Sequence, residues 1–255
     1  MVPEVGDHAS VHFSYEMVAL SPTACEELGI ELAPEDRSKP YVEMSGRKGL
    51  GVKADDLIDR LETDALKEVE TRHPDVSPDQ RQSTAHEIAV GALRYFLLKF
   101  TRNSVIAFDF DEALSFEGET GPYCQYAAVR ANSIFRKLDD DALQQASDLL
   151  AGTDVEGRVS EALNGEAGTE IWSLITLAER LEEAVAQCSV SAEPANLAKY
   201  TFNLAKVFNL FYHRHRIIAE EDAVRRAVLI TAADIARTRL TQALGILGIS
   251  VPERM

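Results

Sequence analysis

The sequence has few cysteines and no long hydrophobic run, and each absence excludes a class of protein. No stretch of its 255 residues approaches the ~18 consecutive apolar residues expected of a membrane helix. The N-terminus has no basic start followed by an apolar run, which argues against a signal peptide. The three cysteines, Cys25, Cys124 and Cys188, are odd in number and far apart, so we expect neither a disulfide framework nor a cysteine metal cluster. This usage favours the reducing cytoplasm.

Common catalytic signatures are also absent. Neither G-x-x-x-x-G-K-[ST] nor G-x-G-x-x-G occurs, and no H-E-x-x-H or Ser–His–Asp order supports hydrolase chemistry. His213 and His215 are two residues apart, a poor spacing for one helical metal site, and no cysteine or acidic residue is near them in the sequence. We therefore predict no metal site.

The charge is strongly acidic but unevenly distributed. The net charge is −16, yet residues 195–255 contain nine Lys and Arg against five Asp and Glu, a net of +4. The preceding 194 residues therefore carry −20. An acidic body with a basic end repels phosphate almost everywhere, which disfavours DNA and non-specific nucleic-acid binding. It leaves room for a protein that reads one RNA in one orientation.

The part of the chain before Gly51 differs from the rest. Apolar and polar residues alternate in the first half of the run from His12 to Leu20, which is typical of a strand, and Tyr41 to Met44 could form a second, short strand. The charged, proline-containing segment between them is predicted to be a loop. Two strands do not form a stable sheet alone. We therefore expect either another chain to pair with them or the rest of the sheet to be missing.

From Gly51 onward the spacing of apolar residues is helical. Ser77-Pro78-Asp79-Gln80 is a good helix start, because serine can cap, proline suits the first helical position and glutamine occupies the capping-box position. A short extended run is predicted at Ser104 to Phe108. Helices are predicted over residues 55–69, 77–98, 121–138, 142–150, 170–187, 194–215 and 221–247, with a glycine-containing loop over 152–168. The chain is thus mainly α, a helical bundle preceded by a small β-containing part.

Three stretches could carry function. The first, Met44 to Gly51, places two adjacent cations in a glycine-spaced loop after a strand, a pattern that can lie over phosphates or can be a basic surface turn. In the second, Tyr123, Tyr126 and Arg130 share one helix face. Such tyrosines can stack on unpaired bases, or pack at the edge of a core with their hydroxyls in water.

The third stretch runs from Asn203 to Arg216. Its Phe208 and Phe211 are predicted to be core residues. It ends His-Arg-His-Arg, and cations at a helix C-terminus are favoured by the helix dipole, which is a sufficient structural explanation of their presence.

Together these stretches resemble arginyl-tRNA synthetase, a class I aminoacyl-tRNA synthetase. The matching segments, in the order of the family, are Tyr15 to Val18, Met44 to Gly49, Asp55 to Leu57, Ser115 to Arg130, Phe208 to Tyr212 and Pro252 to Met255. The G-P-Y-x-Q-Y block and the P-E-R-M ending are the most specific of these, and the similarity extends from about His12 to Met255.

The resemblance implies a division into three parts. Residues 1–53 would be the end of a Rossmann-type nucleotide-binding catalytic domain with a KMSKS-like loop. Residues 54–120 would be a connecting helical region, and residues 121–255 a helical anticodon-binding bundle of the kind named for a D-A-L-R motif. The expected partner is tRNA(Arg), with the catalytic half of the enzyme as a second partner to consider and no membrane.

The resemblance also implies site residues. The residues that would contact ATP, which acts with Mg in the full-length enzyme, are Met44, Ser45, Arg47 and Lys48. The residues that would contact tRNA are Tyr123, Gln125, Tyr126, Arg130, Tyr212, Arg214, Arg216, Arg254 and Met255.

The chain departs from the family at three places. The H-x-G-H signature does not occur, Glu43 and Gly46 stand where class I loops usually carry lysines, and the D-A-L-R tetrapeptide is replaced by Glu193 to Leu197. Adenylate formation needs electrostatic stabilisation from both signature loops. We therefore expect the C-terminal, tRNA-binding portion of an arginine–tRNA ligase that does not activate arginine alone. The alternative is a truncated, synthetase-like helical protein that binds another partner and charges no tRNA.

Overall fold

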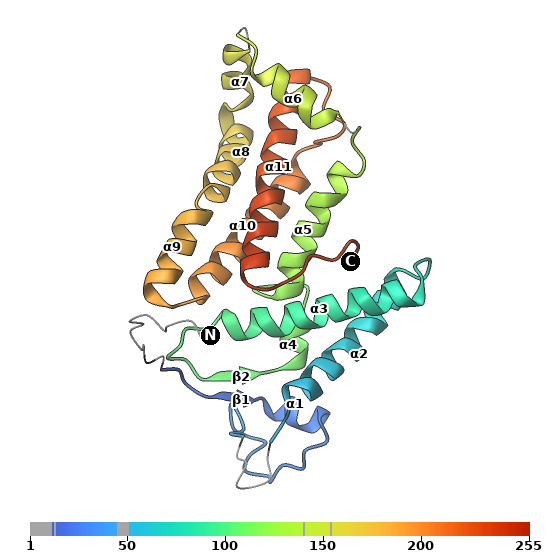
Figure 1. Ribbon diagram of the computed structural model, residues 1–255, viewed down its shortest axis with the longest axis vertical. Helices are drawn as coiled ribbons and strands as arrows, with labels where there is room; N and C mark the ends of the chain where they lie inside the picture. Colours follow the sequence, from blue (N-terminus) through green and yellow to red (C-terminus); the bar gives the residue numbers. More distant parts are fainter. Residues whose placement is uncertain (1–11, 13, 45–50, 140, 154) are drawn as a thin grey trace, which may run out of the picture.

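The computed structural model describes residues 12, 14–44, 51–139, 141–153 and 155–255, and these form two layers of unequal size (Figure 1). A small two-stranded sheet with four helices lies at the base, and a helical bundle stands on it. Helix α3 crosses between the two, so it positions one part against the other.

The sheet joins segments that are far apart in the sequence. Strand β1 (Val18–Leu20) pairs in parallel with β2 (Ile106–Phe108), with Val18 opposite Ile106. The extended run predicted at 104–108 is confirmed for its last three residues. It pairs with β1 within this chain, so the expectation that the first strand pairs only with another chain or with a missing part of the sheet is wrong. The prediction of a strand over residues 12–20 is too long, and residues 41–44 form only one antiparallel bridge, between Val42 and Leu20.

Two capping residues connect the sheet to short helices. Ser21 caps α1 (Pro22–Glu27) by accepting from the Ala24 amide, and Asp109 caps α4 (Phe110–Leu114) by accepting from the Glu112 amide. The Ser21 hydroxyl also donates to Asp109 Oδ2 at 2.7 Å. Both helices therefore begin at the ends of adjacent strands, and the link holds the two starts together.

Helices α2 (Ala54–Arg72) and α3 (Pro78–Leu98) form an antiparallel hairpin. The predicted start of α3 is confirmed, since Ser77 Oγ accepts from the Gln80 amide and Pro78 occupies the first turn. The hydrophobic cluster beneath the hairpin contains an aromatic contact, in which Phe96 and Phe108 meet edge to face with ring centroids 5.1 Å apart. This cluster joins α3 to the sheet.

Helix α5 (Gly121–Phe135) crosses α3 at unusually short range. A Cβ placed on Gly121 would collide with the carbonyl oxygen of Gly91, and a Cβ on Gly91 would lie 2.6–2.7 Å from the amide group of Gln125. Only glycine at both positions permits this approach. The crossing fixes the direction in which α5 enters the bundle.

The bundle is completed by six further helices: α6 (Ala142–Leu150), α7 (Glu156–Ala162), α8 (Gly165–Ala178), α9 (Leu181–Ser191), α10 (Ala195–Arg214) and α11 (Ala223–Ile246). Phe208 and Phe211 of α10 are buried in its core, as predicted. The predicted helix over 170–187 is wrong, because a break at Glu179 and Arg180 separates α8 from α9. The predicted loop over 152–168 is also wrong, since it contains α7 and the start of α8.

Candidate nucleic-acid interface

Helices α5 and α10 bring two predicted tyrosines to one predicted arginine. Tyr126 and Arg130 lie one turn apart on α5, and Tyr212 comes from the last turns of α10. The Arg130 guanidinium carbon lies 4.6 Å from the centroid of the Tyr126 ring and 4.8 Å from that of Tyr212. One cation therefore contacts two aromatic rings from different helices.

Hydrogen bonds hold the guanidinium in this place. Arg130 Nη2 donates to the Tyr126 hydroxyl at 2.9 Å, and Nη1 donates to Asn209 Oδ1 at 2.9 Å. His213 Nε2 lies 3.5 Å from the same Nη1. The four side chains around Arg130, namely Tyr126, Asn209, Tyr212 and His213, are called the Arg130 cluster below.

Asn209 is a member of this cluster that sequence reasoning missed. Asn209 is 9% exposed, so it accepts the Arg130 hydrogen bond from beneath the surface and is not itself open to a ligand. Its spacing of three and four residues from Tyr212 and His213 places all three on one face of α10, which is the signal that could have revealed it.

The cluster presents aromatic surface whose orientation is fixed. Tyr126 and Tyr212 are half-buried and His213 is exposed. An unpaired base can stack on such a ring without regard to its identity, because every base has a π face. One N–H of each Nη atom of Arg130 is donated within the protein, to Tyr126 and to Asn209, and these bonds orient the guanidinium against the rings.

Two other predicted α5 residues are used differently. The half-buried Tyr123 ring packs against Phe202, with centroids 5.4 Å apart. Gln125 is fully buried, and its Nε2 donates to the carbonyls of Glu87 (3.0 Å) and Ser250 (2.8 Å). Gln125 therefore joins α5 to α3 and to the C-terminal tail, and its side chain is not on the surface where an RNA contact was expected.

The cations at the end of α10 have separate surroundings. Arg214 forms ion pairs with Glu170 and, at 3.5 Å, with Glu166 of α8. Arg216 is exposed and lines a cleft of about 290 Å³ beside Tyr212. Of the two predicted arginines, Arg214 is thus engaged by carboxylates and Arg216 borders an opening.

The buried His215 lies between them. Its ring packs on Phe211 with centroids 5.0 Å apart. Burial, followed by the positive charges of Arg225 and Arg214, lowers the pKa of His215 below its usual value of 6.5. The imidazole is therefore neutral at pH 7.

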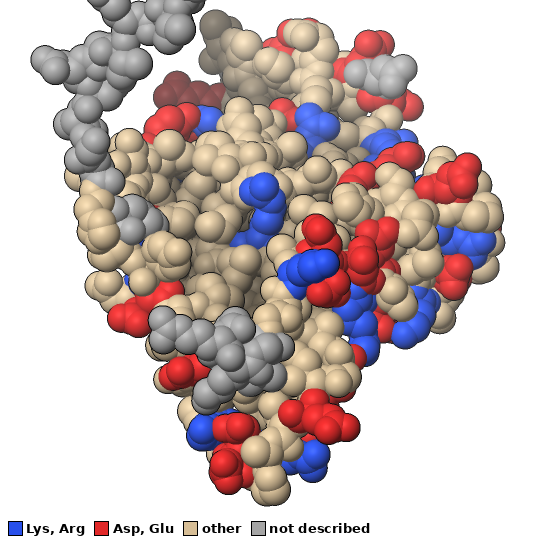
Figure 2. Space-filling view, turned by 60° about the horizontal axis from the view of Figure 1, so that its bottom comes forward, with Lys and Arg blue, Asp and Glu red and all other residues tan. Residues whose placement is uncertain are grey.

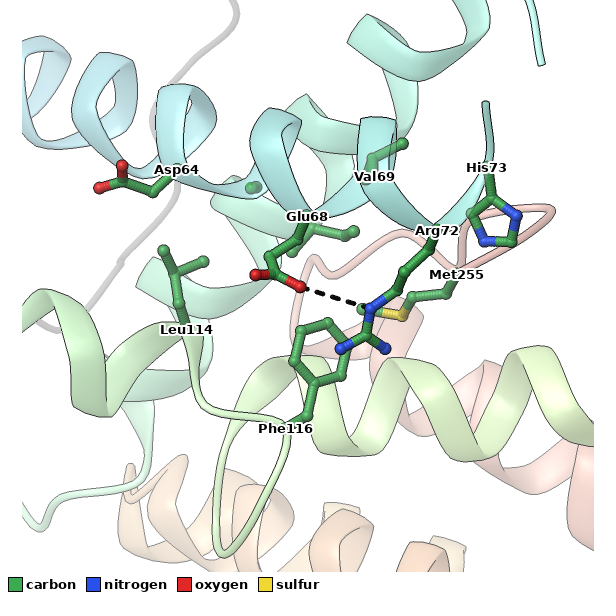
Figure 3. A pocket seen from close by; sticks show the side chains of 10 residues that line it. Asp64, Glu68, Val69, Arg72, His73, Leu114, Phe116 and Met255 are labelled. Atoms are coloured by element: carbon green, nitrogen blue, oxygen red, sulfur yellow. Dashed lines mark ion pairs between the residues drawn. The ribbon is translucent and has the colours of Figure 1, made fainter. Parts of the chain in front are cut away.

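The predicted C-terminal contacts lie against the α2–α3 hairpin. Figure 3 shows the Met255 side chain beside Arg72 and His73 in a small apolar pocket, and Phe116 beneath the Arg72 guanidinium. The Arg72 guanidinium carbon is 4.8 Å from the Phe116 centroid, and Arg72 also pairs with Glu68 at 3.4 Å. Arg254 lies 3.7 Å from Asp75. The tail residues Arg254 and Met255 thus contact the α2–α3 hairpin, whereas the Arg130 cluster is formed by α5 and α10.

The loop predicted to contact ATP is described only at its first residue. Met44 is half-buried and packs against the hydrophobic cluster beneath the hairpin, which includes Phe96 and Phe108. Ser45, Arg47 and Lys48 lie outside the described residues. Among the residues that the structure does describe, no group of three His, Cys, Asp or Glu side chains is placed to hold a metal ion. The described helices also include none with the length and hydropathy of a membrane span.

Charge on the sheet end of the molecule is mixed. In Figure 2, which brings that end forward, acidic and basic side chains lie next to one another, and a broad area near the middle is uncharged. The exposed large hydrophobic residues include Tyr15, Met17 and Val18, on or just before β1. Among the described residues, this end therefore offers apolar surface and charges of both signs close together.

Comparison with known proteins identifies a family for the bundle. Residues 124–255 match the DALR anticodon binding domain. Similar proteins include the arginine–tRNA ligase of Pyrococcus furiosus, 32% identical over 250 residues, which are 97% of this chain and 38% of the relative. The arginine–tRNA ligase of Lactococcus lactis subsp. lactis is 35% identical over 213 residues, or 83% of this chain and 34% of the relative. The chain thus spans little more than a third of the length of these curated relatives.

Solved structures agree with this match. Thermus thermophilus arginyl-tRNA synthetase superposes with a TM-score of 0.66 and 27% identity, covering 96% of this chain and 35% of that one. The crystal structure of arginyl-tRNA synthetase from Plasmodium falciparum gives a TM-score of 0.58 over 80% of this chain and 34% of that one, and at 23% identity it supports the fold alone.

Proposed function

Because the chain belongs to the DALR anticodon-binding domain family, we propose that it binds tRNA(Arg) as the anticodon-recognising part of an arginine–tRNA ligase. The observation that carries this proposal is the Arg130 cluster, which lies within the matched residues and fixes two aromatic rings at the surface. Anticodon loops are single-stranded, and proteins recognise such loops by stacking splayed bases on aromatic side chains. The cluster supplies that chemistry.

The binding mode follows from the geometry of the cluster. Tyr126 and Tyr212 provide stacking faces, and Arg130 and the buried Asn209 keep the rings from rotating away. A ring held before binding loses little conformational freedom when a base stacks on it. Preorganisation of this kind gains affinity without a dense positive surface, which suits a chain of net charge −16.

The proposed role of the remaining part is to present the KMSKS-like loop to ATP. The loop would act with a nucleotide-binding half that carries the other signature loop, in the cytoplasm where tRNA is charged. The exposed apolar residues on and before β1 support docking of such a half at the sheet end. We expect the chain alone to show no arginine-dependent ATP–pyrophosphate exchange, because half of the stabilising constellation is supplied elsewhere.

A binding titration tests the proposal. Filter binding at physiological salt should show preference for tRNA(Arg) over one non-cognate tRNA. Tyr126→Ala should weaken tRNA(Arg) binding by about 1–3 kcal/mol, the usual worth of one base–aromatic stack. Tyr41→Ala is the matched control, since Tyr41 lies in the segment between α1 and α2, outside the bundle.

Two outcomes decide against it. Equal, weak binding of both tRNAs would favour the alternative of a helical interaction protein. Equal losses for Tyr126→Ala and Tyr41→Ala would show that the Arg130 cluster is not the surface that contacts the RNA.

A further inference from the structure

A groove of about 660 Å³ runs between α9 and α11, and none of its lining residues belongs to the Arg130 cluster. Its deep part is apolar, since Leu181 is buried and Val185 is half-buried, and the exposed Ile246 forms part of one wall. Most of the other lining residues are exposed as well, so the groove is open along its length. Such an opening suits an elongated partner rather than a small molecule, which a pocket buries on most sides.

Gly245 lines the groove although the fold around it does not require a glycine. Its φ is not in the left-handed region, and a Cβ built on it would meet nothing within 4 Å. Glycine weakens an exposed helical position relative to alanine, so α11 gains no stability from it. A partner backbone that enters the groove gains room from it, and Ala186 and Ser189 on the opposite wall are small as well.

The end of the groove nearest α8 carries more negative than positive charge. Arg239 pairs with two carboxylates, those of Glu179 at 3.2 Å and Glu182 at 2.9 Å, and both remain more than half exposed. Arg180 pairs with Glu183 at 2.9 Å. Three carboxylates therefore accompany two guanidinium groups, so this end favours a cationic partner and repels an RNA phosphate.

Apolar surface continues along α8 beyond these ion pairs. Trp172, the only tryptophan of the chain, is 57% exposed. It lies seven residues before Glu179, with the half-buried Ile175 between them, and this spacing places all three on one face of α8. Helices α8 and α9 follow one another along one side of the bundle (Figure 1). A partner lying in the groove can therefore extend to a tryptophan, a residue type that often dominates interface energies.

The walls of the groove determine the secondary structure of the partner. Each described residue that lines it belongs to α9 or α11, so an extended peptide finds no strand edge with which to pair. A helix satisfies its own backbone and presents apolar side chains on one face. We propose that the surface from Trp172 to Ile246 docks an amphipathic helix of a partner protein, with lysine or arginine bordering the apolar stripe of that helix.

A second copy of this chain fits the surface less well. A two-fold interface places the same surface of both copies together, which would bring the carboxylates of Glu179, Glu182 and Glu183 near their own counterparts. The net charge of −16 on each copy adds to the repulsion. The inference is independent of the proposed function, because the residues lining the groove are not those of the Arg130 cluster.

The first test fills the groove. The probe is a fluorescein-labelled peptide of about 18 residues, about 27 Å long as a helix, with leucines on one face and lysines beside them. Gly245→Trp should weaken its binding by about tenfold in an anisotropy titration, with an unchanged thermal melt because the added side chain starts in open space. The matched control is Gly157→Trp in α7, where the added carbon also meets nothing within 4 Å. It should leave peptide affinity unchanged.

The second test changes the charge of the groove and keeps its shape. Glu179→Gln combined with Glu182→Gln should weaken binding of the lysine peptide by about fivefold, and should strengthen binding of the same peptide with glutamate in place of lysine. The control is Glu68→Gln combined with Glu112→Gln, which removes two similarly exposed carboxylates from α2 and α4. It should alter neither affinity.

The outcomes identify what occupies the groove. Equal peptide binding by Gly245→Trp and Gly157→Trp, or by the two charge variants, would overturn the inference, because the peptide would then adhere elsewhere on the acidic chain. A dimer of the original chain that Gly245→Trp dissociates in sedimentation would assign the groove to a second copy instead. Weaker tRNA(Arg) binding by Gly245→Trp would assign it to the RNA. Absence of tRNA(Arg) binding by the original chain would remove the proposed function and leave the peptide result standing.

Discussion

At the scale of single residues, Arg130 does two jobs that a lysine cannot combine. Its planar guanidinium lies against two rings, and its two Nη atoms donate in different directions, to Tyr126 and to Asn209. A lysine has a compact ammonium that cannot span both acceptors and lie flat on a ring. At position 130 the planar shape of the guanidinium therefore matters more than its positive charge.

Arg130→Lys should therefore reduce both stability and RNA binding. Asn209 Oδ1 is buried, and leaving it without its donor should lower the free energy of unfolding by about 1–3 kcal/mol. Loosened rings should weaken tRNA(Arg) binding by about tenfold. Urea unfolding and filter binding measure the two effects. Arg136→Lys, the same change at an exposed position ending α5, should alter neither, and equal behaviour of the two variants would refute the account.

His215 predicts how stability depends on pH. Its pKa is lowered by burial and by Arg225 and Arg214, with Glu220 acting in the opposite direction and Glu170 Oε2 lying 3.5 Å from Nε2. The unfolded chain then binds a proton more readily than the folded one, so stability is complete above the unfolded pKa of 6.5 and falls as pH drops toward the folded pKa.

His215→Phe should remove this part of the pH dependence while preserving the contact with Phe211. Urea unfolding between pH 7.5 and pH 5 should show a smaller loss of stability for the variant than for the original chain. A steeper loss of stability with falling pH in His215→Phe would contradict the conclusion that folding lowers the pKa of His215.

At the scale of elements, the α3–α5 crossing sets the architecture. Gly91 and Gly121 let the two backbones approach, and Gln125 fills the remaining space with donors to Glu87 and Ser250 carbonyls. The crossing thereby links the sheet end to the bundle and holds the C-terminal tail. Because Gly91 contacts both Gly121 and Gln125, a larger residue at either glycine position would disturb the packing of the whole crossing.

Gly121→Ala should destabilise the protein by about 1–3 kcal/mol, because the new methyl group meets the Gly91 carbonyl and the backbones must separate. Gly157→Ala in α7 is the matched control, with nothing within 4 Å of the added carbon. It should stabilise the protein by about 0.5–1 kcal/mol through helix propensity. Chemical unfolding of both variants would refute the close-packing account if they changed stability in the same direction.

Patterns among neighbouring residues predicted the helices and strands better than they predicted which of these elements pack or pair with one another. The Ser77 cap, the short strand ending at Phe108 and the long helices depend on neighbouring residues, and these were predictable. The pairing of β1 with a strand at residue 106 is a long-range event with no local trace. The break between α8 and α9 was missed because apolar spacing continues across Glu179 and Arg180.

The site shows the same division. Tyr126, Arg130 and Tyr212 could be named from the motifs that carry the family resemblance, and the structure brings them together. Gln125 belongs to the same motif, yet it is buried, because the space for its amide is created by Gly91 on another helix. No spacing rule within α5 could distinguish its direction from that of Tyr126.

At the scale of the whole molecule, the tail and the charge distribution determine how RNA can approach. The tail crosses α5 at Ser250 and ends with Met255 in the apolar pocket of the α2–α3 hairpin. Many cations are paired: Arg214 with Glu170, Arg158 with Asp222, and Arg239 with Glu179. An RNA therefore meets a mostly acidic or neutralised surface, with cations such as Lys137 and Arg216 exposed beside the Arg130 cluster.

This distribution predicts that tRNA(Arg) binding depends only modestly on salt. Each phosphate contact on single-stranded RNA contributes about −0.7 to the slope of log K against log salt, so two or three contacts give a slope of about −1.5 to −2. Binding should instead be dominated by stacking, which salt screens little. Titrations from 50 to 300 mM KCl measure the slope. A slope steeper than about −5 would require a phosphate track that the ion-paired surface does not offer, and it would place the RNA on a face other than the one formed by α5 and α10.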